Sequence, residues 1–254
     1  MAAIVLSTLP YPTQSGDKLV SKVVTGAIAA LFRHTETIEA TVRAEPVSKL
    51  LQGSLDSFDL IGHNLLMHNG LQIKAMELYL QSISIDFGAI FLGKVKLRQP
   101  TTASMRVVLT QEDLCNSFNT PFILEKLSKL QYQGQGINLE NISINLDKEQ
   151  SLRVSAQANL DKSNEEQPIE ISFTARLEAQ ERRKIQFTNP SYEGDPEAIE
   201  LGKTVIGYIN ELLDLEKFAL DGVDLRIDRL RIQNQQIIFY GTAQINQFPQ
   251  RNKP

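Results

Sequence analysis

LDSFDLIGHNLLMHNGLQIKAMELYLQSISIDF, residues 55–87, carries the strongest structural signal in the chain. Apolar residues recur at alternate positions in two runs, 55–68 and 71–87, which is typical of long β-strands. Asn69 and Gly70 separate the runs, and both accept the positive φ angles that a tight hairpin turn needs. The stretch therefore predicts an antiparallel hairpin whose strands are longer than average.

Further strands are expected on both sides of this hairpin. Upstream, Ile38, Ala40, Val42 and Ala44 alternate with polar residues. Tight turns rather than crossover helices join most of the runs, which favours antiparallel pairing. The other expected strands are 95–109, 137–146, 152–160, 169–177, 185–188, 218–220, 223–232 and 237–245.

Helices are expected at 17–33, 110–119, 121–130 and 196–213. The first carries a broad apolar stripe, and we expect its face of Val20, Val24, Ile28 and Leu31 to pack against the concave side of the sheet. The fold class is therefore α+β, with a long, strongly curved antiparallel sheet wrapped around an N-terminal helix.

The chain of 254 residues could form one large or two small domains. We expect a flexible arm at 1–16, a single elongated domain at 17–248 and a tail at 249–254. The first sixteen residues lack a basic start and a lipoprotein cysteine, so a cytoplasmic protein peripheral to the membrane is expected.

Composition excludes several classes of function. With 42% hydrophobic and 22% charged residues the chain can build a core, and its longest apolar run, 23–32, is too short to span a membrane. A net charge of −4 argues against general nucleic-acid binding. One cysteine and three histidines exclude an intrachain disulfide framework and most closed zinc sites.

No catalytic motif is present. The sequence lacks GxGxxG, GxxxxGK[ST], HExxH and GxSxG. His63 and His68 lie five positions apart on an expected strand, hence on opposite faces, His34 lies at a helix-to-strand junction, and Cys115 has no basic neighbour in sequence. We therefore expect no catalytic residue, no metal and no cofactor.

A basic segment follows a short apolar one. Between Asp86 and Glu112 there is no acidic residue, and Lys94, Lys96 and Arg98 alternate with apolar residues. An apolar knob beside cations suits docking on an anionic membrane surface. A buried connector followed by a solvated strand face is the alternative. The expected docking residues are Phe87, Ile90, Phe91, Leu92, Lys94, Lys96 and Arg98.

The same region resembles the LmeA-like phospholipid-binding family of bacterial proteins. The GK-x-x-L-x-x-P pattern is met by Gly93-Lys94, Leu97 and Pro100, and the V-x-LT-x-x-DL pattern is met from Val107 to Leu114. The ending, 218–248, with its FxLxGVxLxIxxLxI run, is also similar to the family's last strands. The resemblance implies a long curved sheet around a helix, similar to tubular lipid-binding domains, with an apolar interior for acyl chains.

Two functions follow. The first is non-catalytic binding of phospholipid or another acyl-chain lipid in an apolar groove at an anionic membrane surface, which would serve lipid transfer or membrane maintenance. An elongated apolar cavity above about 300 Å³ is then expected. The alternative is a scaffold protein that binds a protein partner through its sheet. The oligomeric state stays open. The expected lipid-binding residues are Val20, Val24, Ile28, Leu31, Ala40 and Val42.

Overall fold

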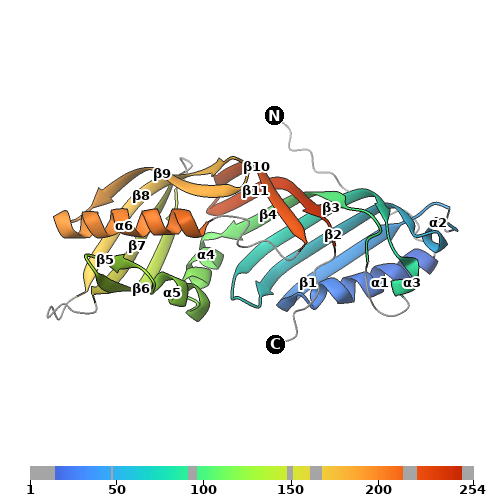
Figure 1. Ribbon diagram of the computed structural model, residues 1–254, viewed down its shortest axis with the longest axis horizontal. Coiled ribbons are helices and arrows are strands. Elements are labelled where there is room, and N and C mark those ends of the chain that lie inside the picture. The colour runs from blue at the N-terminus through green and yellow to red at the C-terminus, as the bar shows by residue number, and fades with distance from the viewer. Residues whose placement is uncertain are drawn as a thin grey trace.

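The computed structural model describes residues 15–46, 48–90, 96–147, 151–160, 168–213 and 222–247. They form an elongated molecule with two halves arranged end to end (Figure 1). The elements are α1 (Ser15–Ala29), β1 (Phe32–Arg43), α2 (Ser48–Leu51), β2 (Ser54–Met67), β3 (Gln72–Ser84), α3 (Phe87–Ile90), β4 (Thr101–Thr110), α4 (Gln111–Phe118), α5 (Pro121–Leu127), β5 (Gln131–Tyr132), β6 (Gln135–Leu146), β7 (Ser151–Leu160), β8 (Ile169–Gln180), β9 (Lys184–Glu193), α6 (Pro196–Leu212), β10 (Val223–Gln233) and β11 (Gln236–Ile245).

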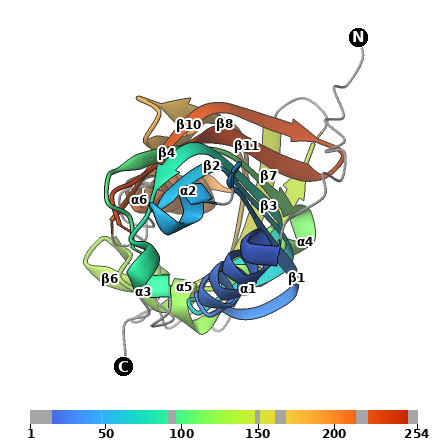
Figure 2. The same ribbon diagram turned by 90° about the vertical axis from the view of Figure 1, so that its right-hand side faces the viewer.

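The first half is a six-stranded antiparallel sheet in the order β1-β2-β3-β4-β11-β10. The last two strands of the chain thus complete the sheet that the first four began. Seen along the long axis of the molecule, this sheet curls, and α1 lies along β1 at one side of the curl (Figure 2). The α+β class with a curved sheet is confirmed.

The register of this sheet places apolar residues in continuous rows on its inner, concave face. Each row crosses all six strands, and every position in it is apolar. The rows are Val42–Phe58–Leu80–Ala103–Ala243–Leu225, Ala40–Leu60–Leu78–Met105–Gly241–Ile227 and Ile38–Gly62–Met76–Val107–Phe239–Leu230.

Charged groups of the same strands lie on the outer, convex face. Arg43 lies 3.4 Å from Asp59, and Arg106 lies 2.6 Å from Glu77. Burial raises the pKa of the Asp59 carboxyl, and nearby Arg43 opposes this shift. The sheet therefore has one apolar face and one largely polar face, on which Val108 and Ile238 are buried apolar residues.

Helix α1 covers the free edge of β1. The backbone N–H of Ala40 donates to Thr25 Oγ1 at 3.0 Å, and that of Val42 donates to Ser21 Oγ at 2.9 Å. The predicted helix face points into the core of this half, where Val20, Val24 and Ile28 are buried. The helix thus packs at the edge of the sheet and not along the middle of its concave face.

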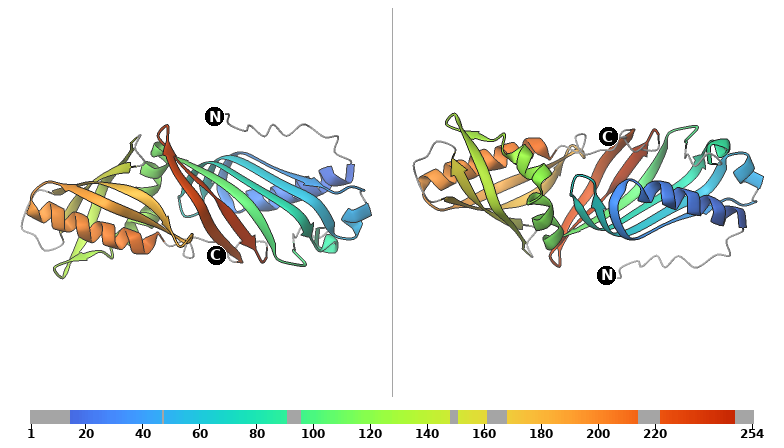
Figure 3. Two further views of the ribbon diagram at one scale, coloured as in Figure 1. Left: turned by 90° about the horizontal axis from the view of Figure 1, so that it is seen from above. Right: turned by 90° about the horizontal axis from the view of Figure 1, so that it is seen from below.

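The second half has a sheet of its own, in the order β5-β6-β7-β8-β9. Helix α6 packs against β8 and β9, and α4 packs against β6. The core of this half includes Phe173, Ile171 and Leu201, and it continues under the ends of β2, β3, β4, β10 and β11. Figure 3 shows the two halves and the strands β10 and β11 lying across the middle of the molecule.

The structure differs from the sequence predictions in three places. The single long sheet is divided into two sheets, because β5–β9 pair only among themselves within the described residues. The strand expected at 95–109 begins at Thr101, and only Leu97 before it bridges to Ile85. The expected strand at 218–220 lies outside the described residues. Within the described residues no helix is long and apolar enough to cross a membrane.

The hydroxyl groups of Ser21 and Thr25 are expected to stabilise the fold by pairing the edge of β1. Replacing both, in the variant Ser21→Ala with Thr25→Val, leaves two backbone N–H groups without these acceptors. Each loss costs about 1–3 kcal/mol, so we expect the free energy of unfolding to fall by about 2–6 kcal/mol in urea titrations. Thr102→Val, at an exposed position of β4, is the control and should change stability by less than about 0.5 kcal/mol. A double variant as stable as the wild type would contradict the edge-pairing role.

Candidate functional site

The middle of the inner face is the part of the apolar surface that is only half covered. Helix α1 covers one end of this face, and the core of the second half closes the other. Between them Ile38 of β1, Met76 and Leu78 of β3 and Val107 of β4 are partly accessible. Met76 packs against both core clusters, so this half-covered patch lies where the two meet.

Sequence reasoning did not single out this patch. Its strands were expected, but the patch exists only because four positions from three strands share two cross-strand rows. A single strand's alternation shows which side a residue faces and not which residues are its neighbours. We call Ile38, Met76, Leu78 and Val107 the inner patch.

The residues expected to bind lipid lie at one end of the inner face. Val20, Val24, Ile28, Ala40 and Val42 are all buried in one cluster between α1 and the sheet. Leu31, just after the helix, is half-buried. The structure thus brings the helix and strand residues together as closely packed core, and their contact with a lipid stays a prediction.

Two cavities of the molecule differ in volume and in lining. An apolar cavity of about 20 Å³ lies in the second half, lined by residues such as Phe118, Ile144 and Phe173. This volume is far below what an acyl chain needs, so the accessible apolar surface of interest is the inner patch. The large apolar cavity expected from the sequence stays a prediction.

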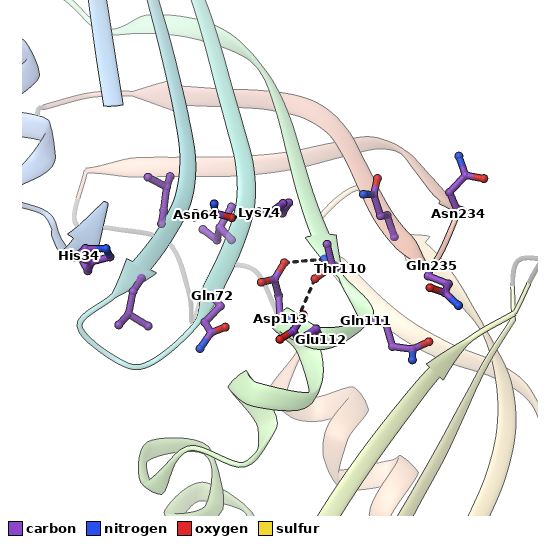
Figure 4. Close-up of a pocket in the computed structure, with 14 residues that line it drawn as sticks. His34, Asn64, Gln72, Lys74, Thr110, Gln111, Glu112, Asp113, Asn234 and Gln235 are labelled. Carbon is purple, nitrogen blue, oxygen red and sulfur yellow. Dashed lines mark hydrogen bonds between the residues drawn. The ribbon is translucent and has the colours of Figure 1, made fainter. Parts of the chain in front are cut away.

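The second cavity, of about 630 Å³, is polar and lies at the junction of the halves (Figure 4). Lys74 and Asn64 line one side, with Lys74 Nζ donating to Asn64 Oδ1 at 2.8 Å. The start of α4 lines another side, where Thr110 and Asp113 form a reciprocal cap with bonds of 2.9 and 3.0 Å. Because its lining carries both cations and carboxylates, its chemistry selects no single class of ligand.

One end of the molecule carries the segment expected to dock on membranes. We call α2, α3 and residues 96–98 the tip; α2 and α3 lie together at this end in Figure 1. Leu51 is 71% exposed there. Lys96 and Arg98 are exposed, and the Arg98 guanidinium donates to the Gln52 carbonyl at 2.8 Å.

The structure describes only part of the other expected docking residues. Phe91, Leu92 and Lys94 lie outside the described residues, and for Phe87 and Ile90 the structure gives the backbone of α3. Lys96 and Arg98 flank Leu97, which forms an isolated antiparallel β-bridge with Ile85. Leu51 was missed by sequence reasoning, because a leucine that ends a short helix is usually buried.

Side chains with catalytic or metal-binding chemistry are dispersed. His63 Nδ1 lies 3.1 Å from Thr37 Oγ1, on the outer face. Cys115 contacts the backbone of Ile144, with its sulfur 3.2 Å from the nitrogen and 3.3 Å from the oxygen. Among the described residues no three His, Cys, Asp or Glu side chains gather as a metal site would require.

Comparison with known proteins agrees with this architecture. No curated protein and no solved structure matches the chain significantly. The family model described as LmeA-like phospholipid-binding matches residues 14–242, which includes both sheets and nearly all of β11. The chain therefore belongs to the LmeA-like phospholipid-binding family.

Proposed function

We propose that this protein binds phospholipid, or another lipid with acyl chains, on the inner patch and without catalysis. Membership of a phospholipid-binding family supports lipid binding in general. The observation that carries the proposal is the half-covered apolar surface of Ile38, Met76, Leu78 and Val107 between two filled cores. An acyl chain laid on it would gain about 0.8 kcal/mol for each buried methylene group.

The flanking cores support this assignment. Helix α1 is held to β1 by two hydrogen bonds, and its buried face closes one end of the inner face. A chain extending past the inner patch toward α1 would meet Ala40 and Val42, the strand residues expected from the sequence.

We also propose that the tip brings the protein to an anionic membrane surface, where it transfers lipid or maintains the membrane. The exposed Leu51 adds an apolar side chain to the segment Phe87 to Arg98, and Lys96 and Arg98 add positive charge. Insertion of apolar side chains and attraction of cations are the two terms that hold peripheral proteins to anionic lipid.

Polar substitution of the inner patch should lower the lipid content of the purified protein. In the variant Met76→Gln with Leu78→Gln, each amide facing an acyl chain lacks a hydrogen-bond partner, at a cost of about 1–3 kcal/mol. We therefore expect at least about tenfold weaker retention of phospholipid, measured by native mass spectrometry.

The control for this experiment is Tyr79→Gln, on the outer face of the same strand, where the side chain is 38% exposed. It should keep the lipid content of the wild type. The proposal fails if the inner-patch variant is folded and retains as much lipid as the wild type, or if the wild type neither retains nor takes up phospholipid.

Substitutions at the tip should separate the electrostatic contribution to membrane binding from the apolar contribution. Exchanging Lys94, Lys96 and Arg98 for Glu should weaken flotation with anionic liposomes by several kcal/mol, at about 1 kcal/mol or more per charge, and the effect should shrink as salt rises. Replacing Leu51, Phe91 and Leu92 by Ser should weaken binding at all salt concentrations, because apolar burial is lost.

Phe122→Ser is the control for the apolar set, because Phe122 is 39% exposed on α5, away from the tip. It should float as the wild type does. Unchanged flotation of both tip variants would show that the tip is not a docking surface.

A further inference from the structure

Three arginines form a row on the outer face of the edge strand β10. Arg226 and Arg229 are exposed and Arg231 is half-buried. In the register they lie beside Thr242, Tyr240 and Ile238 of β11, which are successive outward positions about 7 Å apart. We call Arg226, Arg229 and Arg231 the arginine row.

A β-bulge creates this row. The register shifts between Ile227 and Arg229, so that Asp228 is the extra residue. With strict alternation from Ile227, Arg229 and Arg231 would face the core and Leu230 would face outward. The bulge instead keeps Leu230 and Ile232 with the core and directs both arginines outward.

The opposite strand is adapted to the bulge. Gly241 pairs with Ile227, and a side-chain carbon at Gly241 would lie 1.9 Å from the Arg226 carbonyl oxygen. Only glycine permits this close approach of the two backbones.

The acids nearest to the row form no salt bridge with it. Asp228 forms an ion pair with Arg182, in the turn between β8 and β9, and the Ile227 N–H donates to the Arg182 carbonyl at 2.8 Å. Asp224, at the outward position next to Arg226, accepts from the neutral Asn246 side chain at 3.4 Å and keeps its negative charge at the end of the row. Among the described residues, no carboxylate forms a salt bridge with any member of the arginine row.

We propose that the arginine row is a docking surface for the anionic headgroups of a phospholipid bilayer. Guanidinium groups bind phosphate oxygens in a two-pronged geometry, and a row of three can engage several neighbouring headgroups at once. The protein as a whole carries a net charge of −4, so a row of three arginines without salt-bridge partners among the described residues is a local departure from its overall charge. The proposal rests on the membrane association proposed above, but it uses a surface separate from the tip and the inner patch.

The test compares vesicles of phosphatidylcholine with vesicles that contain 30% phosphatidylserine, a composition chosen as roughly that of an anionic leaflet. The variant carries Arg226→Gln, Arg229→Gln and Arg231→Gln. Each cation near the surface contributes about fivefold, so we expect about a hundredfold weaker binding to the anionic vesicles in low salt. The loss should diminish as salt rises, and binding to the neutral vesicles should not change.

The control variant removes three cations from the second half, by Arg153→Gln, Arg176→Gln and Lys203→Gln. It changes the net charge equally and should bind anionic vesicles within a few-fold of the wild type. Exchanging the arginine row for lysine should also preserve most of the binding, because the positive charges remain.

The proposal is overturned if the arginine-row variant binds anionic vesicles as the wild type does, or if the control variant loses as much. It is also overturned if the wild type binds an RNA homopolymer at least as tightly as the vesicles, since the row would then be a general anion surface. Lipid content by native mass spectrometry should be equal in the arginine-row variant and the wild type. A loss of lipid content only in the inner-patch variant, with docking unchanged, keeps the two proposals distinguishable.

Discussion

In both sheets of this protein, strands at or near an edge have N–H and C=O groups that need partners, and side chains of helices or of their caps supply several of them. On β1 the partners are Ser21 and Thr25 of α1. On β6, the Asn119 amide both donates to and accepts from Ile142, and Gln111 accepts from Leu146 at 2.9 Å. These parts of β1 and β6 are thereby closed against pairing with another chain.

The spacing of helix and strand explains why this arrangement works. Four residues of an α-helix rise about 6.0 Å, and two residues of a strand rise about 6.8 Å. Polar side chains four apart on α1 therefore meet N–H groups two apart on β1. The far edge of the second sheet uses the same principle, where Asn210 of α6 accepts from the Phe187 N–H at 2.8 Å. Because α1 lies over an edge, the middle of the inner face is left half covered.

The periodicity of the sequence was sufficient to identify strands and helices, but not their partners. Alternation placed Ala40 and Val42 on one face, and the apolar stripe placed Val20, Val24 and Ile28 toward the core. The division into two sheets depends on which strands pair across long separations, and no local pattern records that. In the sequence, Ser21 and Thr25 are recognised only as residues on the polar side of a helix. Their role as hydrogen-bond acceptors for β1 is not visible there, because it depends on where β1 lies in the fold.

The bulge in β10 shows a different limit. Its signal is present in the sequence, where the apolar Leu230 follows the apolar Ile227 by three positions, whereas strict alternation would give two or four. The inward position of both residues becomes clear only with the register against β11, in which they pair with Gly241 and Phe239. The candidate site also depends on strand register, because residues 38, 76, 78 and 107 of the inner patch become neighbours only when β1 to β4 pair. The segment proposed for docking, in contrast, was singled out from composition, since its absence of acids is a local property.

The separation of faces connects the fold to its function. On the outer face of the first sheet the charges of Arg43 and Arg106 are matched by Asp59 and Glu77, which leaves little net charge over its middle. Exposed pairs of this kind stabilise weakly, at about 0–1 kcal/mol each, but they cancel charge that would otherwise attract anions. Positive potential is therefore confined to places where cations lack such partners. A protein with a net negative charge can approach an anionic bilayer only through such places, and this restricts how its apolar inner face can be oriented toward the lipid.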